Sequence, residues 1–172
     1  MNLLDYLPTV PDFPKPGIMF KDISPLLADH RAFTYAIDQL YDLSNFYDFD
    51  YVLGIESRGF IFATALAQAS KKGLVLARKP NKLPRKVYSE SYGLEYGADS
   101  LQIQQDILPN DAKVLLIDDV LATGGTLVAA ANLVRKAGAN VVGTLVLLEI
   151  AELMGYNKLA KENIQLKSLI QI

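Results

Sequence analysis

The chain has 172 residues, of which 51% are hydrophobic and 21% are charged, a composition typical of a folded globular protein rather than a disordered one. Its 17 basic and 19 acidic side chains give a net charge of −2, which argues against a general nucleic-acid-binding protein. With no cysteine and one histidine, the sequence excludes disulfides, thiolate metal sites, a cysteine nucleophile and sites built from several histidines.

The N-terminal residues show no basic segment followed by an apolar core, so they do not resemble a signal peptide. No apolar run reaches the roughly 18 residues that a membrane-spanning helix needs. We therefore expect a cytoplasmic protein that has no membrane partner.

The first patterned segment is rich in proline. Residues 8–17 hold four prolines and a glycine, which exclude regular helix and a central strand. Apolar residues such as Val10, Phe13 and Phe20 indicate a packed arm rather than a loose linker. Asp29 suits a helix N-cap, and the apolar spacing after it predicts a helix from about 30 to 44.

The rest of the chain alternates between short apolar runs and helical segments. The apolar runs predict strands at 51–55, 73–77, 113–117, 141–150 and, as an edge strand, 164–172. The helical segments run from after residue 60 to about 72, from 126 to 138 and from about 151 to 160. Residues 78–100 are polar and predict a long loop with β-hairpin character. This alternation predicts an α/β fold in which helices flank a mainly parallel sheet, in one domain over residues 1–172.

The segment VLLIDDVLATGGT, residues 114–126, joins an acidic pair to a turn of small residues. Ligands of open α/β sheets bind beyond the carboxyl ends of the strands, where Asp118 and Asp119 fall. Since neighbouring strand residues point to opposite faces, we expect one aspartate to face the ligand and the other the loop. The glycines let the backbone approach a ligand, and the helix start at Thr126 offers N–H groups to an anion. Together these features predict a site for a phosphorylated sugar.

Two other interpretations of the acidic pair fit less well. The metal-binding strand of a nucleoside triphosphatase would need a GxxxxGK[ST] loop, which the sequence lacks. A receiver domain carries its acidic pair after the first strand, whereas this pair lies past residue 110.

VLLIDDVLATGGT is similar to the signature of the type I phosphoribosyltransferases, which bind 5-phosphoribosyl-1-pyrophosphate (PRPP). Four further segments resemble the adenine-specific members of this family in order and spacing: FPKPGIMFKDISPLL (13–27), GIESRGFIFATALA (54–67), RKPNKLP (78–84) and SYGLEYG (91–97). The resemblance covers nearly the whole chain. It implies the type I phosphoribosyltransferase fold, with an N-terminal hood arm at about 1–27 and a mobile, hairpin-like flap at about 78–100.

The resemblance also implies a donor site in three parts. The ribose 2′- and 3′-hydroxyls bind to Asp118 and Asp119. The 5-phosphate lies in the loop formed by Ala122, Thr123, Gly124, Gly125 and Thr126. The pyrophosphate is bound by Glu56, Ser57, Arg58, Arg78, Lys79 and Lys82, and the Glu56–Ser57 peptide is one that is often cis in this family. The implied cofactor is Mg²⁺, held mainly by the substrate, with Asp118 and Asp119 reaching it through water.

The base site is implied by the same resemblance. Glu95, on the flap, and Arg58 take catalytic roles, Glu95 as the acid/base near the purine. Phe20 stacks on adenine, and the Met19 backbone bonds its Watson–Crick edge. Lys21 stands beside them where many members carry arginine, and Ile150 packs on the opposite face of the base.

The implied reaction converts adenine and PRPP into AMP and pyrophosphate in purine salvage, carried out by a homodimer. Two alternatives stay open. One is a phosphoribosyltransferase for hypoxanthine, guanine or xanthine, and the other is a non-catalytic, ligand-sensing regulator on the same fold.

Overall fold

The computed structural model describes residues 1–93 and 99–172, which form two compact units, residues 1–39 and residues 40–172. The first unit contains η1 (Leu3–Tyr6), the antiparallel strands β1 (Thr9–Val10) and β2 (Phe20–Lys21), α1 (Ser24–Ala28) and most of α2 (His30–Ser44), whose last turn belongs to the second unit.

Helix α2 begins where the sequence predicts. The Asp29 carboxylate accepts hydrogen bonds from the amides of Arg31 and Ala32, at 2.9 and 3.0 Å, so it caps the helix start as expected. The sequence pattern does not predict α1, because a helix of five residues is too short to show a helical period.

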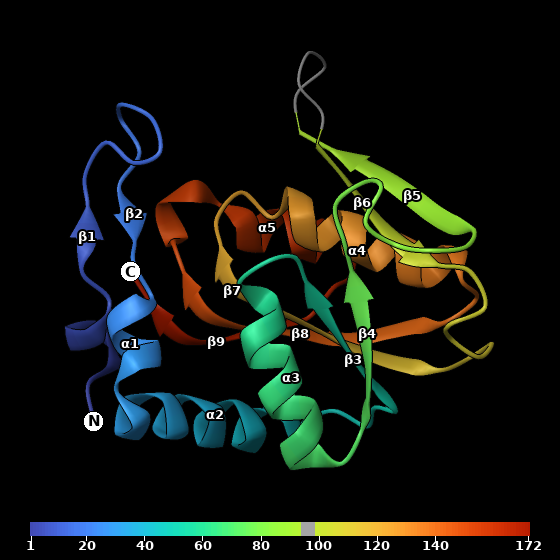
Figure 1. Ribbon diagram of the computed structural model, residues 1–172, viewed down its shortest axis with the longest axis horizontal. Coiled ribbons are helices and arrows are strands. Elements are labelled where there is room, and N and C mark those ends of the chain that lie inside the picture. The colour runs from blue at the N-terminus through green and yellow to red at the C-terminus, as the bar shows by residue number, and fades with distance from the viewer. Residues whose placement is uncertain (94–98) are drawn as a thin grey trace. The chain divides into compact units, whose positions relative to one another are not determined.

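The second unit is built on a five-stranded sheet whose strand order is β4-β3-β7-β8-β9 (Figure 1). Its strands are β3 (Tyr51–Ile55), β4 (Gly73–Ala77), β7 (Lys113–Leu121), β8 (Asn140–Glu149) and β9 (Leu166–Gln171). All four strand pairings are parallel, which confirms the predicted sheet, and β9 is an edge strand as expected. The middles of β3, β7 and β8 are continuously buried, which explains their unbroken apolar runs.

The connections of the sheet reverse direction between β3 and β7. Helix α3 (Gly59–Ser70) leads from β3 outward to β4, whereas α4 (Gly125–Lys136) leads from β7 the other way to β8. Since such crossovers are right-handed, α3 and α4 cover opposite faces of the sheet. This reversal makes the carboxyl ends of β3 and β7 the topological switch point of the sheet, which is where α/β sheets bind ligands.

Strand β7 is longer than the predicted 113–117, because β8 continues to pair with it to Leu121. Its pairing with β3 stops at Ile117. The aspartate pair therefore lies inside the strand, and from Asp118 onward β3 no longer pairs with it.

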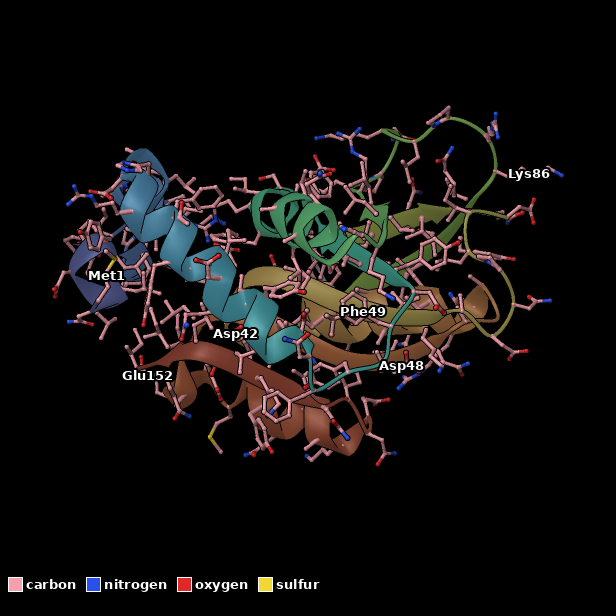
Figure 2. All side chains as sticks on the ribbon, turned by 90° about the horizontal axis from the view of Figure 1, so that it is seen from below. Met1, Asp42, Asp48, Phe49, Lys86 and Glu152 are labelled. Carbon is pink, nitrogen blue, oxygen red and sulfur yellow. The ribbon has the colours of Figure 1, made fainter. Side chains whose placement is uncertain are left out.

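The strands β5 (Val87–Tyr92) and β6 (Asp99–Gln104) pair antiparallel beside α4 (Figure 1), so the hairpin extends four residues beyond the predicted 78–100. Glu90 holds it to the helix, because its carboxylate accepts hydrogen bonds from the Asn132 amide and the Lys136 ammonium. Lys86, which precedes the hairpin, is exposed and points away from the ribbon (Figure 2).

The C-terminal part adds η2 (Ala151–Leu153) and α5 (Gly155–Lys161) between β8 and β9. Among the described residues, no helix combines the length and the apolar character needed to cross a bilayer.

Candidate active site

The loop that follows β3 contacts the acidic pair of β7 at the carboxyl ends of the two strands. The Arg58 Nε atom, in the loop after β3, lies 2.8 Å from Oδ2 of Asp119. Asp118 contacts the same loop, because its Oδ1 atom lies 2.8 Å from the position that a Cβ on Gly59 would occupy. Both carboxylates therefore lie against residues 58–59, rather than one against the loop and one away from it. A side chain at position 59 would push Asp118 out of place.

The aspartate pair is held in an environment that disfavours its charge. Burial and the neighbouring charge of Asp119 raise the pKa of Asp118 well above the ordinary 3.8. Burial also raises the pKa of Asp119, although the Arg58 guanidinium opposes this shift. Oδ2 of Asp119 accepts no aligned hydrogen bond from the described residues despite being buried. Hydroxyl donors or a cation from a ligand would satisfy this pair.

The loop after β7 ends at a helix start whose first amides have no acceptor within the helix. Gly124 precedes α4 with φ of +81°, a conformation that favours glycine. The first amide to donate within the helix is that of Val128, to the Gly124 carbonyl at 3.0 Å. The amides of Gly125, Thr126 and Leu127 therefore have no helical acceptor, and the first turn carries neither a side-chain cap nor an acidic residue. The helix begins one residue before the predicted start, and free amides at a helix start are groups suited to an anion.

Helix α5 packs directly against this loop. A Cβ on Gly155 would lie only 2.2 Å from the Ala122 carbonyl oxygen, and one on Gly124 would lie 3.0 Å from the Gly155 carbonyl oxygen. A Cβ on Gly125 would lie 3.6 Å from the Lys158 Nζ atom and 3.8 Å from Tyr92. Gly155, Lys158 and Tyr92 are missing from the predicted site. Nothing in the local sequence distinguishes Gly155 and Lys158 from surface or turn residues, whereas Tyr92 lies in the SYGLEYG segment but has no predicted role there.

Tyr92 links the hairpin to the anion site. Burial and the nearby charges of Asp99 and Asp118 raise the pKa of its hydroxyl, while a hydrogen bond with the Thr126 side chain opposes the shift. Thr126 therefore has a hydrogen-bonding partner in the hairpin as well as a place at the helix start.

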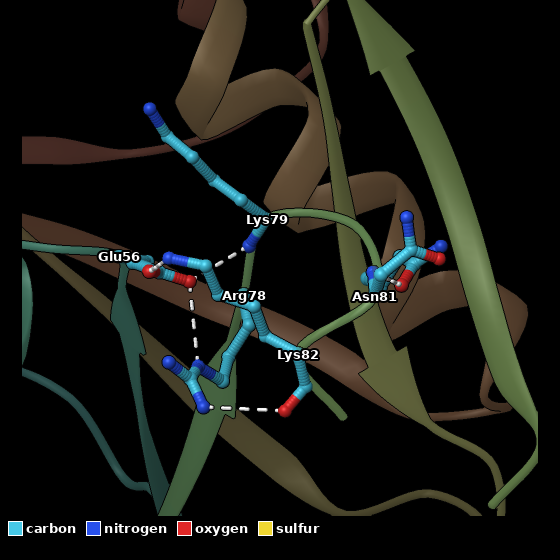
Figure 3. Close-up of polar contacts among 6 residues, drawn as sticks. Glu56, Arg78, Lys79, Asn81 and Lys82 are labelled. Atoms are coloured by element: carbon cyan, nitrogen blue, oxygen red, sulfur yellow. Dashed lines mark hydrogen bonds and ion pairs between the residues drawn. The ribbon is translucent and has the colours of Figure 1, made fainter. Parts of the chain in front are cut away.

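The predicted pyrophosphate residues converge on Glu56 (Figure 3). Its carboxylate, 6% exposed, accepts hydrogen bonds from the Lys79 amide at 2.9 Å, from Arg78 Nε at 3.3 Å and from the Lys82 ammonium. Burial opposes ionisation of Glu56, but these three donors outweigh it and lower the pKa of the carboxyl below the ordinary 4.5. The Glu56 side chain therefore serves as an anchor for the 78–82 segment.

The other members of this group are placed differently. The Glu56–Ser57 peptide bond is cis, and Ser57 is exposed. The Lys79 ammonium points away from Glu56 (Figure 3), so only its backbone takes part in the anchor. The Arg78 guanidinium also donates to the Lys82 carbonyl, which closes the segment into a compact loop.

Glu56→Gln should lower the free energy of unfolding by about 2 kcal/mol at neutral pH, because hydrogen bonds to a buried charge are worth more than those to an amide. Since the folded-state pKa of Glu56 is lowered, this stabilisation is present above the ordinary value of 4.5 and is lost as the pH falls through the folded-state pKa. Urea unfolding of both proteins between pH 3 and pH 7 measures the difference.

Glu162→Gln is the matched control, because the ion pair of Glu162 with Arg135 spans 3.8 Å and both side chains are exposed. It should change stability by no more than about 0.5 kcal/mol at any pH. A Glu56→Gln difference that does not depend on pH would contradict the assigned anchor.

The predicted base-binding residues lie on separate elements. In the first unit the Phe20 ring packs edge-on against Phe13, with ring centroids 5.0 Å apart, and Met19 is 60% exposed. The Lys21 ammonium donates to the Thr9 hydroxyl at 2.6 Å, across β1 and β2. In the second unit, half-buried Ile150 donates its amide to the Leu121 carbonyl directly after β8. Glu95 lies outside the described residues.

Comparison with known proteins agrees with this geometry. A family model described as the phosphoribosyl transferase domain matches residues 20–164. The chain is 62% identical over 171 residues to the adenine phosphoribosyltransferase of Polynucleobacter asymbioticus, with 99% of each chain covered. The crystal structure of adenine phosphoribosyltransferase from Thermoanaerobacter pseudethanolicus is similar with a TM-score of 0.95 and 41% identity, covering 99% of this chain and 100% of that one. The Saccharomyces cerevisiae enzyme, solved with adenine and an imino-altritol bisphosphate, gives a TM-score of 0.89 at 36% identity over 97% of this chain and 96% of that one.

These similarities confirm the type I phosphoribosyltransferase fold that the sequence predicts. They also agree with the adenine-specific resemblance of the segments outside the signature. The chain belongs to the phosphoribosyltransferase family and, within it, to the adenine phosphoribosyltransferases.

Proposed function

We propose that this protein transfers the 5-phosphoribosyl group of PRPP to adenine, giving AMP and pyrophosphate. The observation that carries the proposal is the aspartate pair, with Asp119 buried and Asp118 half-buried, joined through one short loop to the start of α4, whose first amides have no acceptor within the helix and no side-chain cap. Carboxylates suit ribose hydroxyls and free amides suit a phosphate, so one continuous segment matches a 5-phosphoribosyl group. The relatives named above are adenine phosphoribosyltransferases, which supports adenine as the acceptor.

In this reaction the bond from the ribose C1 to the pyrophosphate oxygen breaks and a bond from adenine N9 to C1 forms. Positive charge develops on the ribose as the pyrophosphate leaves with the bonding electrons, and one proton leaves the adenine. Asp118 and Asp119 hold the ribose hydroxyls, while the amides of residues 122–126 bind the 5-phosphate. No residue needs to form a covalent bond to the ribose.

The leaving pyrophosphate requires positive charge. We assign this role to Arg58, which pairs with Asp119, and to the 78–82 segment, which is anchored by Glu56. Lys79 offers its ammonium from the side away from Glu56, and Ser57 offers its backbone and hydroxyl. Glu56 acts through these cations and not by touching the anion, since two negative groups repel each other.

For the base, we propose that Phe20 stacks on adenine, that the Met19 backbone hydrogen-bonds its Watson–Crick edge and that Ile150 packs on the other face. The exposure of Met19 and the edge-on packing of Phe20 against Phe13 support a role for the arm in binding the base. Lys21 uses its ammonium within the arm, so we expect it to position the arm before it contacts the base. Glu95 as the group that takes the purine proton stays a prediction.

The aspartate pair also fits a role with Mg²⁺. Among residues 1–93 and 99–172 no group of three or more acidic or histidine side chains is arranged to hold a metal ion. The buried Oδ2 of Asp119, which pairs with the Arg58 guanidinium but accepts no aligned hydrogen bond from the described residues, is nevertheless a suitable oxygen for a hydrated cation whose remaining ligands come from the substrate. Bound with PRPP, Mg²⁺ would neutralise charge on the departing pyrophosphate.

A base-competition assay tests the proposal. With PRPP and Mg²⁺, purified protein should form AMP from adenine with a kcat/KM at least 100-fold above that for hypoxanthine, guanine or xanthine, since unmatched polar edges are strongly rejected. If another purine is turned over at a comparable kcat/KM, the assignment of adenine as the specific substrate is wrong. Binding of PRPP and adenine without release of pyrophosphate would favour the regulator.

The remaining expectations are separate from this test. The homodimer, the cytoplasmic location and the single domain with a hood arm at about 1–27 and a flap at about 78–100 stay predictions. Sedimentation of the purified protein at micromolar concentration would measure the first of them directly.

A further inference from the structure

A lysine outside the recognised motifs lies beside the anion site. Helix α5 packs on the loop before α4, with Gly155 against the Ala122 carbonyl. Lys158, one turn further along α5, extends from there over the start of α4. Its Nζ atom lies 3.6 Å from the position that a Cβ on Gly125 would occupy, and Gly125 is the first residue of α4.

The Lys158 ammonium is available for a ligand. The side chain is exposed, and within the described part of the chain it takes part in no hydrogen bond or ion pair. Neither α5 nor the first turn of α4 places an acidic side chain beside it. A lysine ammonium is a flexible point charge with three donors, which suits a phosphate whose other oxygens are already bound by backbone amides.

The local charge balance favours such a cation. A 5-phosphate at the start of α4 would lie near the aspartate pair, whose charges the protein already tolerates poorly. Helix amides contribute only about half a positive charge. A full positive charge on the α5 side would offset the repulsion between the phosphate and the aspartates.

We infer that Lys158 binds the 5-phosphate of PRPP and of AMP, as a charged partner to the amides of residues 122–126. This inference rests on the proposed role of that loop. Lys158 is a binding residue for the phosphate common to substrate and product, and it makes no contact with pyrophosphate or the base.

Calorimetry with four probes separates these contacts. Ribose 5-phosphate and AMP carry the phosphate, whereas pyrophosphate and adenine do not. Lys158→Gln should weaken binding of the first two roughly five- to tenfold and leave the other two unchanged, and 0.5 M salt should shrink the loss because an exposed charge is screened. Lys158→Arg should retain most of the affinity. Lys161→Gln, an exposed lysine of the same helix, is the matched control and should bind all four probes like the wild type.

Each outcome decides a different point. Ribose serves as a fifth probe for the wild type. If the wild type binds ribose 5-phosphate no better than ribose, the phosphate role of residues 122–126 fails and the inference fails with it. If the wild type prefers ribose 5-phosphate and Lys158→Gln keeps that preference undiminished, the inference about Lys158 alone is overturned. An unchanged unfolding midpoint for Lys158→Gln shows that a loss of affinity is local.

Discussion

Asp118→Asn and Asp119→Asn should each lower kcat/KM for PRPP roughly 100-fold, because each removes about 2–3 kcal/mol of charge-assisted hydrogen bonding to the ribose. The amide keeps the size and one acceptor of the carboxylate, so the fold should persist. Steady-state kinetics at saturating adenine measures the loss. Asp42→Asn, at an exposed position of α2, is the control and should leave these constants unchanged.

The same variants make an independent prediction about stability. The raised pKa of Asp118 means that its ionised form destabilises the folded protein, so this unfavourable contribution appears as the pH rises through the folded-state pKa. At pH 7, the free energy of unfolding of Asp118→Asn should therefore equal that of the wild type or exceed it by about 1 kcal/mol. An active-site residue that lowers activity and raises stability on replacement is retained for function. Near-normal kinetics in both variants would remove the donor assignment.

The pair also predicts the acid limb of the pH profile. The donor site needs carboxylates that accept hydrogen bonds from the ribose hydroxyls, and burial raises the pKa values of both aspartates above 3.8. In the free enzyme, kcat/KM for PRPP should therefore fall with decreasing pH while ordinary surface aspartates are still ionised. The affinity for adenine alone should not fall over the same pH range.

The sequence predicts the fold and the donor site because both depend on local patterns. Apolar runs separated by helical segments predict a parallel sheet, and glycine beside a helix start predicts an anion site without any knowledge of the tertiary structure. The aspartate pair is informative for the same reason, since its place along β7 follows from the strand itself. In this region the structure differs from the prediction in where β7 ends, because pairing with β8 extends the strand past Ile117. It also differs in the contacts of the aspartates, both of which lie against residues 58–59.

Contacts between distant segments are what the sequence does not predict. Glu56 belongs to a loop after β3, yet its carboxylate gathers Arg78, Lys79 and Lys82 from the segment after β4. The motif alone places all four on the pyrophosphate, because it carries no information on which charges pair with each other. Gly155 is a stronger case, since nothing in MGYNK indicates that its α-carbon faces the Ala122 carbonyl.

Gly155→Ala tests that contact and should have the second largest effect. The new Cβ would lie 2.2 Å from the Ala122 carbonyl oxygen and 2.7 Å from Leu121 Cδ1, so either α5 or the loop must move. Overpacking of this kind costs about 1–3 kcal/mol of stability. Because the displaced backbone is the proposed 5-phosphate cradle, KM for PRPP should also rise roughly tenfold. The KM for adenine and the affinity for pyrophosphate should change far less.

A second glycine separates the loop effect from general destabilisation. Gly143 lies in β8, where a Cβ would lie 2.3 Å from the Tyr47 ring, so Gly143→Ala introduces a comparable clash away from the carboxyl ends of the strands. It should lose stability and keep the KM for PRPP of the wild type. If both variants lose stability but neither changes this KM, α5 supports the fold without shaping the phosphate cradle. If only Gly155→Ala raises it, the position of the cradle depends on a residue that no donor-binding motif contains.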